Sequence, residues 1–226
     1  MSSSRAAGIS MLVFAVAGVI WFVTELAPAT AGFADTDNPA VMLDFLREHP
    51  WPYRIGAISL FTMAASLAMA VLAMADIIQA SGGTLTARWT TATGLLAAAF
   101  FFGHGVLRMS GGPLAHIEGQ DEAWGQAAYL SVQMTGVHGF AQGAVVALCV
   151  WAVAIGVVGL RSGALPTWVS VLAIVPLLRL VGALLGPLEL LPESLWIVFM
   201  ASIVGTMLWS FALAIALLLR ARSSST

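Results

Sequence analysis

The sequence contains no lysine, so all nine of its basic residues are arginines. Retinal pigments hold their chromophore on a lysine amine, and this absence excludes a rhodopsin-like protein. Cys149 is the single cysteine, so no disulfide can form within the chain. Phosphate-binding loops, nucleophile elbows and His-Glu-x-x-His metal motifs are also absent. No basic cluster suggests nucleic acid as a partner.

Charge of either sign is scarce. Charged residues make up 9% of the 226 residues and hydrophobic residues 60%, which is too apolar for the surface of a soluble protein of this length. A membrane-spanning helix needs ~20 apolar residues, so the chain can hold about six with short loops. We therefore predict an all-α, polytopic transmembrane helix bundle that forms one domain over residues 1–226.

Six apolar runs provide these spans, at about residues 7–26, 55–78, 89–109, 130–160, 167–186 and 195–219. The first run has an alternative interpretation as a secretory signal peptide, because Arg5 precedes it and Ala29-Thr30-Ala31 resembles a cleavage site. Its length, however, is that of a complete span rather than of the shorter apolar region of a signal peptide.

A short helix is expected after the first span, over about residues 39–49. Asn38-Pro39 has the pattern of a helix cap followed by proline at the first helical position. Apolar residues then recur at helical spacing between Val41 and Leu46, until a second proline ends the run. This pattern favours a helix lying on the membrane surface.

Basic and acidic residues separate to opposite sides of the six-span arrangement. Nine of the eleven acidic residues lie on one side, mostly in loops after the first and third spans. Basic loops face the cytoplasm, so we predict cytoplasmic termini and a multi-pass protein of the cytoplasmic (inner) membrane. The arginines on this side are Arg5, Arg88, Arg161, Arg220 and Arg222.

Ionisable residues within the spans are the candidates for function, because placing them in lipid is costly. A helix rises ~1.5 Å per residue, and this spacing puts five of them at the level of the outer leaflet, on four helices. They are Glu25, His104, Arg108, His138 and Arg179. The sequence thus predicts how deep each residue lies in the membrane. It does not predict toward which neighbouring helix each side chain points.

Arg179 is the charge that is hardest to explain by structure alone. It follows Pro176 by three residues, and a proline there bends the helix because it lacks an N–H. Glu25 is the best-placed carboxylate by depth. Three interpretations are open: the two residues form an ion pair between the first and fifth spans, the Arg179 side chain snorkels outward to the interface, or Arg179 holds an anion such as a lipid headgroup or a small carboxylate.

Two histidines offer a different chemistry. His104 and His138 lie at similar depths on consecutive antiparallel spans, where facing imidazoles could ligate a haem iron. With Glu25 they could form a zinc or non-haem iron site. No ligand pair has i, i+3 or i+4 spacing and no haem-attachment motif occurs. We therefore predict no cofactor, with haem or a metal ion as the alternative.

Three segments carry a resemblance to known proteins. They are Tyr53-Arg54-Ile-Gly56 entering the second span, His138-Gly139 in the fourth, and Arg161-Ser-Gly-Ala-Leu-Pro166 after it. In these segments and in its layout the chain resembles a broad bacterial family of six-helix integral membrane proteins of unknown function. The resemblance implies a six-helix bundle in the cytoplasmic membrane and no particular activity.

The expected function is non-enzymatic. We predict a binding, transport-accessory or sensory protein, surrounded by membrane lipids, whose outer-leaflet site takes an anionic or lipid-like ligand. One alternative is a redox subunit or enzyme that binds haem or a metal through His104 and His138. The other is a structural subunit of a larger membrane complex or a homo-oligomer.

Overall fold

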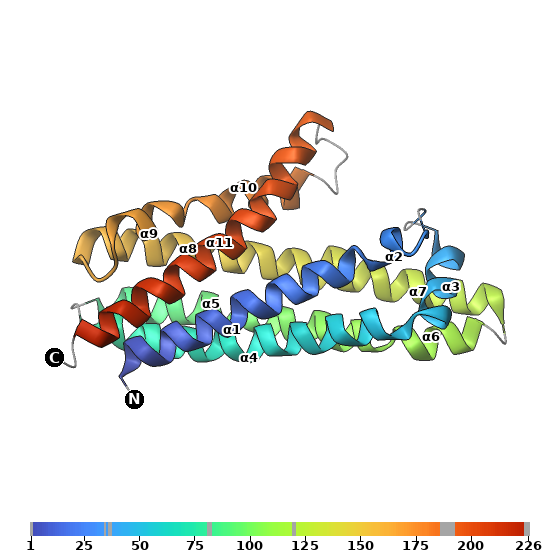
Figure 1. The fold of residues 1–226 in the computed structure, drawn as a ribbon, viewed down its shortest axis with the longest axis horizontal. Helices are drawn as coiled ribbons and strands as arrows, with labels where there is room; N and C mark the ends of the chain where they lie inside the picture. Colours follow the sequence, from blue (N-terminus) through green and yellow to red (C-terminus); the bar gives the residue numbers. More distant parts are fainter. Residues whose placement is uncertain are drawn as a thin grey trace.

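The computed structural model describes the backbone of residues 2–33, 35, 38–80, 83–118, 121–185 and 193–223, with side chains except at 112, 118, 181–185 and 193–200. These residues form helices and short connections, with no β-strand among them, so the predicted all-α class is confirmed. Both ends of the chain lie at the same end of an elongated bundle (Figure 1). We call this the terminal end and the opposite one the distal end.

Five segments of the described chain are long and apolar enough to cross a membrane, which identifies a multi-pass membrane protein. The fourth of them includes η1, a π-helix whose backbone hydrogen bonds reach one residue further than those of an α-helix. The helices are α1 (Ser3–Glu25), α4 (Pro50–Ala80), α5 (Thr84–Met109), the continuous α7 (Glu122–Gln133), η1 (Met134–Ala141) and α8 (Gln142–Ser162), and α11 (Glu193–Ser223).

The span predicted over residues 167–186 is a broken helix. α9 (Thr167–Leu172) ends in a turn, and α10 (Val175–Leu185) follows with Pro176 in its first turn. Because proline cannot donate the hydrogen bond that continues a helix, the break lies where the sequence predicted a bend. Cys149 Sγ on α8 donates a 2.9 Å hydrogen bond to the Pro176 carbonyl, which ties the broken segment to α8.

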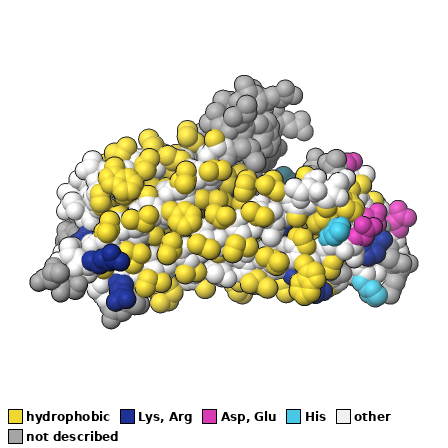
Figure 2. Space-filling view, in the orientation of Figure 1, with side chains coloured by type: hydrophobic (Ala, Val, Ile, Leu, Met, Phe, Trp, Pro, Cys, Tyr) yellow, Lys and Arg dark blue, Asp and Glu magenta, His cyan; other side chains and the backbone are white. Residues whose placement is uncertain are grey.

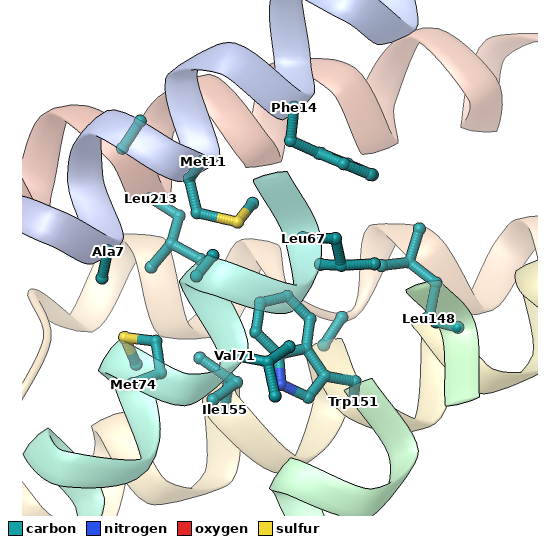
Figure 3. Packing of buried hydrophobic residues seen from close by; sticks show 14 of the residues in the cluster. Ala7, Met11, Phe14, Leu67, Val71, Met74, Leu148, Trp151, Ile155 and Leu213 are labelled. Carbon is teal, nitrogen blue, oxygen red and sulfur yellow. The ribbon is translucent and has the colours of Figure 1, made fainter. Parts of the chain in front are cut away.

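The apolar core lies where α1, α4, α5, α8 and α11 meet. Met11, Leu67 and Trp151 come from three of these helices, pack in one cluster and are fully buried (Figure 3). Small residues bring the helices close: a Cβ on Gly94 of α5 would lie 2.3 Å from Val71 and 2.8 Å from Trp151. This close packing fixes the rotation of the helices, and therefore the side chains that meet at the distal end.

Short helices cover the distal end. α2 (Ala27–Thr30) follows α1, and α3 (Pro39–Glu48) confirms the short helix predicted there. Asn38 caps α3 as expected, because its side chain accepts a 3.0 Å hydrogen bond from the Ala40 N–H. The apolar face of α3 packs on protein, with Met42, Leu43, Phe45 and Leu46 against Leu114, Ala115 and Tyr129.

The connection after α5 differs from the acidic loop that the sequence predicted. Residues Gly111–Glu118 form α6, and α7 begins at Glu122 with Asp121 as its cap. Leu114 and Ala115 bury against α3, and this packing stabilises a helix where two glycines and a proline favour a loop.

The surface has an apolar middle. Hydrophobic side chains cover this part of the face in Figure 2, with arginines at the terminal end and acidic, histidine and arginine side chains gathered at the distal end. Exposed tryptophans flank the apolar zone: Trp51 and Trp124 at the distal end, and Trp89 and Trp168 at the terminal end. Tryptophan prefers membrane interfaces, so a bilayer fits between these two pairs.

Candidate functional site

A cavity of about 330 Å³ lies toward the distal end, between α1, α4, α5, the η1 region and α10. Glu25, His104, Arg108 and Arg179 line it, which are four of the five residues that the sequence placed at one depth. We call it the polar cavity. The other polar or aromatic side chains that line it are Trp21, Thr24, Tyr53, Gln133 and Gln142.

Glu25 pairs with Arg108 rather than with Arg179. Arg108 Nη1 lies 2.5 Å from Glu25 Oε1, and the Arg108 side chain is 7% exposed whereas that of Glu25 is 36% exposed. Arg108 also lies over the ring of Tyr53, with Cζ 4.1 Å from the ring centroid. The first span is therefore joined to the third, and not to the fifth as the depths suggested.

Gly56 makes this pairing sterically possible. α4 packs against both α1 and α5, so the Arg108 side chain must pass α4 to reach Glu25. A Cβ on Gly56 would lie 2.6 Å from Arg108 Nε and 2.7 Å from Thr24 Oγ1. Only a residue without a side chain leaves room for the guanidinium at this point.

Arg179 enters the site from α10, just after the break at Pro176. It lines the polar cavity and also a smaller cavity of about 20 Å³ that continues between α1 and α11. Its Nε is buried and finds no hydrogen-bond acceptor within the described part of the chain. The guanidinium thus brings a second positive charge to a site where Glu25, the one carboxylate among the described lining residues, is already paired.

Three side chains that line the polar cavity carry buried N–H donors without an acceptor among the described residues. They are the indole Nε1 of Trp21 and the Nε atoms of Arg108 and Arg179. Buried donors are normally paired, and leaving one unpaired costs ~1–3 kcal/mol. The described lining, with two guanidinium groups, one carboxylate and surplus donors, favours a ligand that is negatively charged or rich in hydrogen-bond acceptors.

His104 and His138 occupy different surroundings. His104 is 6% exposed, lines the polar cavity, and lies within hydrogen-bonding reach of the Gly136 backbone. His138 is exposed and does not line the cavity; its neighbours Val137 and Ala141 do. The structure therefore does not bring the two imidazoles together, and no group of three or more metal-ligating side chains occurs within the described residues.

The π-helical geometry of η1 explains which residues of this helix reach the cavity. Nine residues at ~100° each would place Gln133 and Gln142 on opposite faces of an α-helix. The wider turns of η1 lie between them and rotate the chain by less per residue. Both glutamines consequently line the same cavity, and His138 is turned away from it.

Sequence reasoning missed Trp21, Gln133 and Gln142 as site residues. Trp21 had a detectable signal, because it precedes Glu25 by one helical turn. Gln142 is a polar amide inside a predicted span, which also marks a candidate. Gln133 lies in the same predicted span and carries the same signal, but its place in the site beside Gln142 depends on the π-helix.

Comparison of the sequence with family models and with curated proteins, and of the structure with solved structures, found no match. The resemblance to a six-helix bacterial family therefore stays a prediction.

Proposed function

We propose that this chain is a non-enzymatic, six-span protein of the bacterial cytoplasmic membrane that binds an anionic or lipid-like ligand in the polar cavity. Six crossings are supported by the position of the chain ends. Both lie at the terminal end (Figure 1), which requires an even number of crossings. The broken helix α9–α10 supplies the sixth, in addition to the five long apolar segments.

The distribution of charge supports the orientation. Arg88 and Arg161 lie next to the terminal end on α5 and α8, together with the arginines near both chain ends. By the positive-inside rule the terminal end faces the cytoplasm. The polar cavity then opens at the level of the outer leaflet, where a lipid headgroup or a small molecule from outside can reach it.

The observation that carries the proposal is the surplus of buried donors on Trp21, Arg108 and Arg179. A carboxylate or phosphate would accept hydrogen bonds from these donors and balance the charge that Glu25 leaves uncompensated. A volume of about 330 Å³ lies at the lower end of the range for small-molecule sites, so the cavity fits a small anion or the polar head of an amphiphile.

A thermal-shift screen of the detergent-purified protein tests this function. Small carboxylates, inorganic phosphate and short-chain phospholipids serve as ligands, and a stabilising compound is re-tested on Arg179→Ala. We expect the apo variant to fold and the ligand-induced shift to be lost. Arg161→Ala, which removes an exposed arginine at the terminal end, is the matched control and should keep the shift.

Two outcomes would contradict the proposal. One is an unchanged ligand shift in Arg179→Ala, which would remove Arg179 from the site. The other is an apo variant that fails to insert or unfolds, whereas the Arg161→Ala control is normal. That result would make Arg179 a structural residue that joins α10 to the rest of the bundle.

A further inference from the structure

A second and larger cavity, of about 930 Å³, lies at the distal end between α3, the start of α4, the end of α5 and α6. We call it the rim cavity. Tyr53 and Arg108 line both this cavity and the polar cavity, so they form the wall between the two. Arg179, Glu25 and His104 do not line the rim cavity, which makes it a separate site.

Among the described residues that line the rim cavity, several are basic and none is a carboxylate. Three arginines and a histidine are among them: Arg47, Arg54, Arg108 and His116. Two of the arginines have carboxylate partners, since Asp44 pairs with Arg47 at 2.9 Å and Glu25 pairs with Arg108. Neither of these carboxylates lines the cavity.

Arg54 is the arginine that is available to a ligand. It is exposed and has no carboxylate within ion-pair distance in the described chain. Its guanidinium lies near Trp51, with Cζ 5.4 Å from the ring centroid, and the side chain lines the cavity while remaining exposed to solvent.

The position of the cavity matches the headgroup level of a bilayer. Trp51, which is 66% exposed, lies beside it at the start of α4, and tryptophan prefers this interface. The remaining lining is apolar and suits the glycerol and first methylene groups of a lipid. It consists of Leu46, Pro50, Met109, Pro113 and Ala115.

We propose that the rim cavity binds the phosphate group of a membrane phospholipid, with Arg54 as the principal contact. A guanidinium presents paired N–H donors that match phosphate oxygens, and the interfacial position puts a lipid phosphate within reach. The volume is large enough for a headgroup with its glycerol. This site is additional to the polar cavity and does not depend on a ligand there.

Native mass spectrometry of the detergent-solubilised protein tests the proposal, with phosphatidylglycerol as the titrated lipid. We expect Arg54→Gln to weaken binding about tenfold, as the loss of one charge-assisted contact implies. Arg54→Lys should retain part of the affinity. Arg88→Gln is the matched control, because Arg88 is also an exposed arginine beside a tryptophan, at the terminal end, and it should bind as the parent does.

Two further comparisons define the ligand, and the Arg54→Gln variant tests the contact. Diacylglycerol, which lacks the phosphate, should bind much more weakly than phosphatidylglycerol, and equal binding would overturn the proposal. Millimolar inorganic phosphate should not displace the lipid, and complete displacement would overturn the lipid as the occupant. Equal lipid affinity in Arg54→Gln and the parent protein would remove Arg54 from the site.

The two proposals fail separately. Arg179→Ala should leave phosphatidylglycerol binding unchanged, because Arg179 does not line the rim cavity. Loss of lipid binding in Arg179→Ala together with full binding in Arg54→Gln would assign the lipid to the polar cavity and overturn the rim site.

Discussion

Arg108 on α5 and Glu25 on α1 form an ion pair of 2.5 Å even though α4 packs between their helices. The pair closes over Gly56, where a side chain would collide with the guanidinium. Glu25 on α1 and Arg108 on α5 are therefore joined at the point where Gly56 of α4 leaves room for the guanidinium, so three helices meet there. This connection also forms part of the wall between the polar and rim cavities.

Substitution of Gly56 by alanine tests the connection directly. The added Cβ would lie 2.6 Å from Arg108 Nε, so Arg108 must shift and its contact with Glu25 weakens. We expect a loss of ~1–3 kcal/mol in stability, the usual cost of overpacking, measured as a lower thermal transition in detergent. Gly139→Ala is the control, because nothing lies within 4 Å of its added Cβ. Equal transitions in the two variants would show that the contact at Gly56 is not tight.

Glu25→Gln should destabilise the protein by leaving Arg108 without its counter-charge. Breaking a buried pair costs ~3–5 kcal/mol, but Glu25 is about one-third exposed, so we expect ~1–3 kcal/mol. The double variant Glu25→Gln with Arg108→Gln should lose less than the sum of the single variants, as coupled partners do. Asp44→Asn breaks the exposed pair with Arg47 and should cost less than ~1 kcal/mol. Strict additivity of Glu25 and Arg108 would contradict the pairing.

The two histidines should respond differently to alanine substitution. His104 is 6% exposed and lines the polar cavity, so His104→Ala should lower stability by ~1–3 kcal/mol and reduce the ligand-induced shift. His138 is exposed, and His138→Ala should change stability by less than ~0.5 kcal/mol. Thermal unfolding with and without a stabilising ligand measures both effects. An absorption spectrum and metal analysis of the same samples test the alternative: equal loss of a chromophore or metal in both variants would establish joint ligation.

The side of the membrane on which each end lies can be read by cysteine labelling. In a Cys149→Ala background, Ser2→Cys and Ser223→Cys should react with a membrane-impermeant maleimide only after cell lysis, whereas Glu122→Cys should react in intact cells. This pattern follows from six crossings and a cytoplasmic terminal end. Labelling of Ser2→Cys and Ser223→Cys on opposite sides would mean that α9–α10 does not cross the membrane.

Features with a local physical cause were predictable from the sequence. The cap at Asn38 and the break at Pro176 follow from one residue and its neighbours, and both are confirmed. Helix rise predicts a similar level for Glu25, Arg108 and Arg179, and the three residues line one cavity toward the distal end. The loop predicted after α5 was wrong because tertiary packing of Leu114 and Ala115 outweighs the local preference of glycine and proline.

The partners of the site residues were not predictable, because they depend on helix rotation. Depth alone favoured Arg179 as the partner of Glu25, whereas the close approach at Gly56 selects Arg108. The outward orientation of the His138 side chain depends on the π-helix η1. No type of residue predicts the hydrogen bonding of a π-helix, so this orientation could not be predicted from the sequence. Gly56, which leaves room for Arg108, and the π-helix η1, which turns Gln133 toward the cavity, thus determine which side chains meet in the site.

The length of η1 also constrains how the chain can vary. A π-helical segment accommodates an additional residue within a helix, so deletion of one residue from 134–141 would restore ordinary α-helical turns. Gln133 and Gln142 would then be eight residues apart, which at ~100° per residue leaves ~80° between them, so both would still face the polar cavity on an intact helix. A one-residue deletion in this segment should therefore keep both glutamines in the site, whereas a deletion in the regular α-helix beside it would rotate the residues before it by ~100° relative to those after it. The widened turn is thus a position where the helix can lose a residue and keep its cavity-lining side chains in register with the other helices.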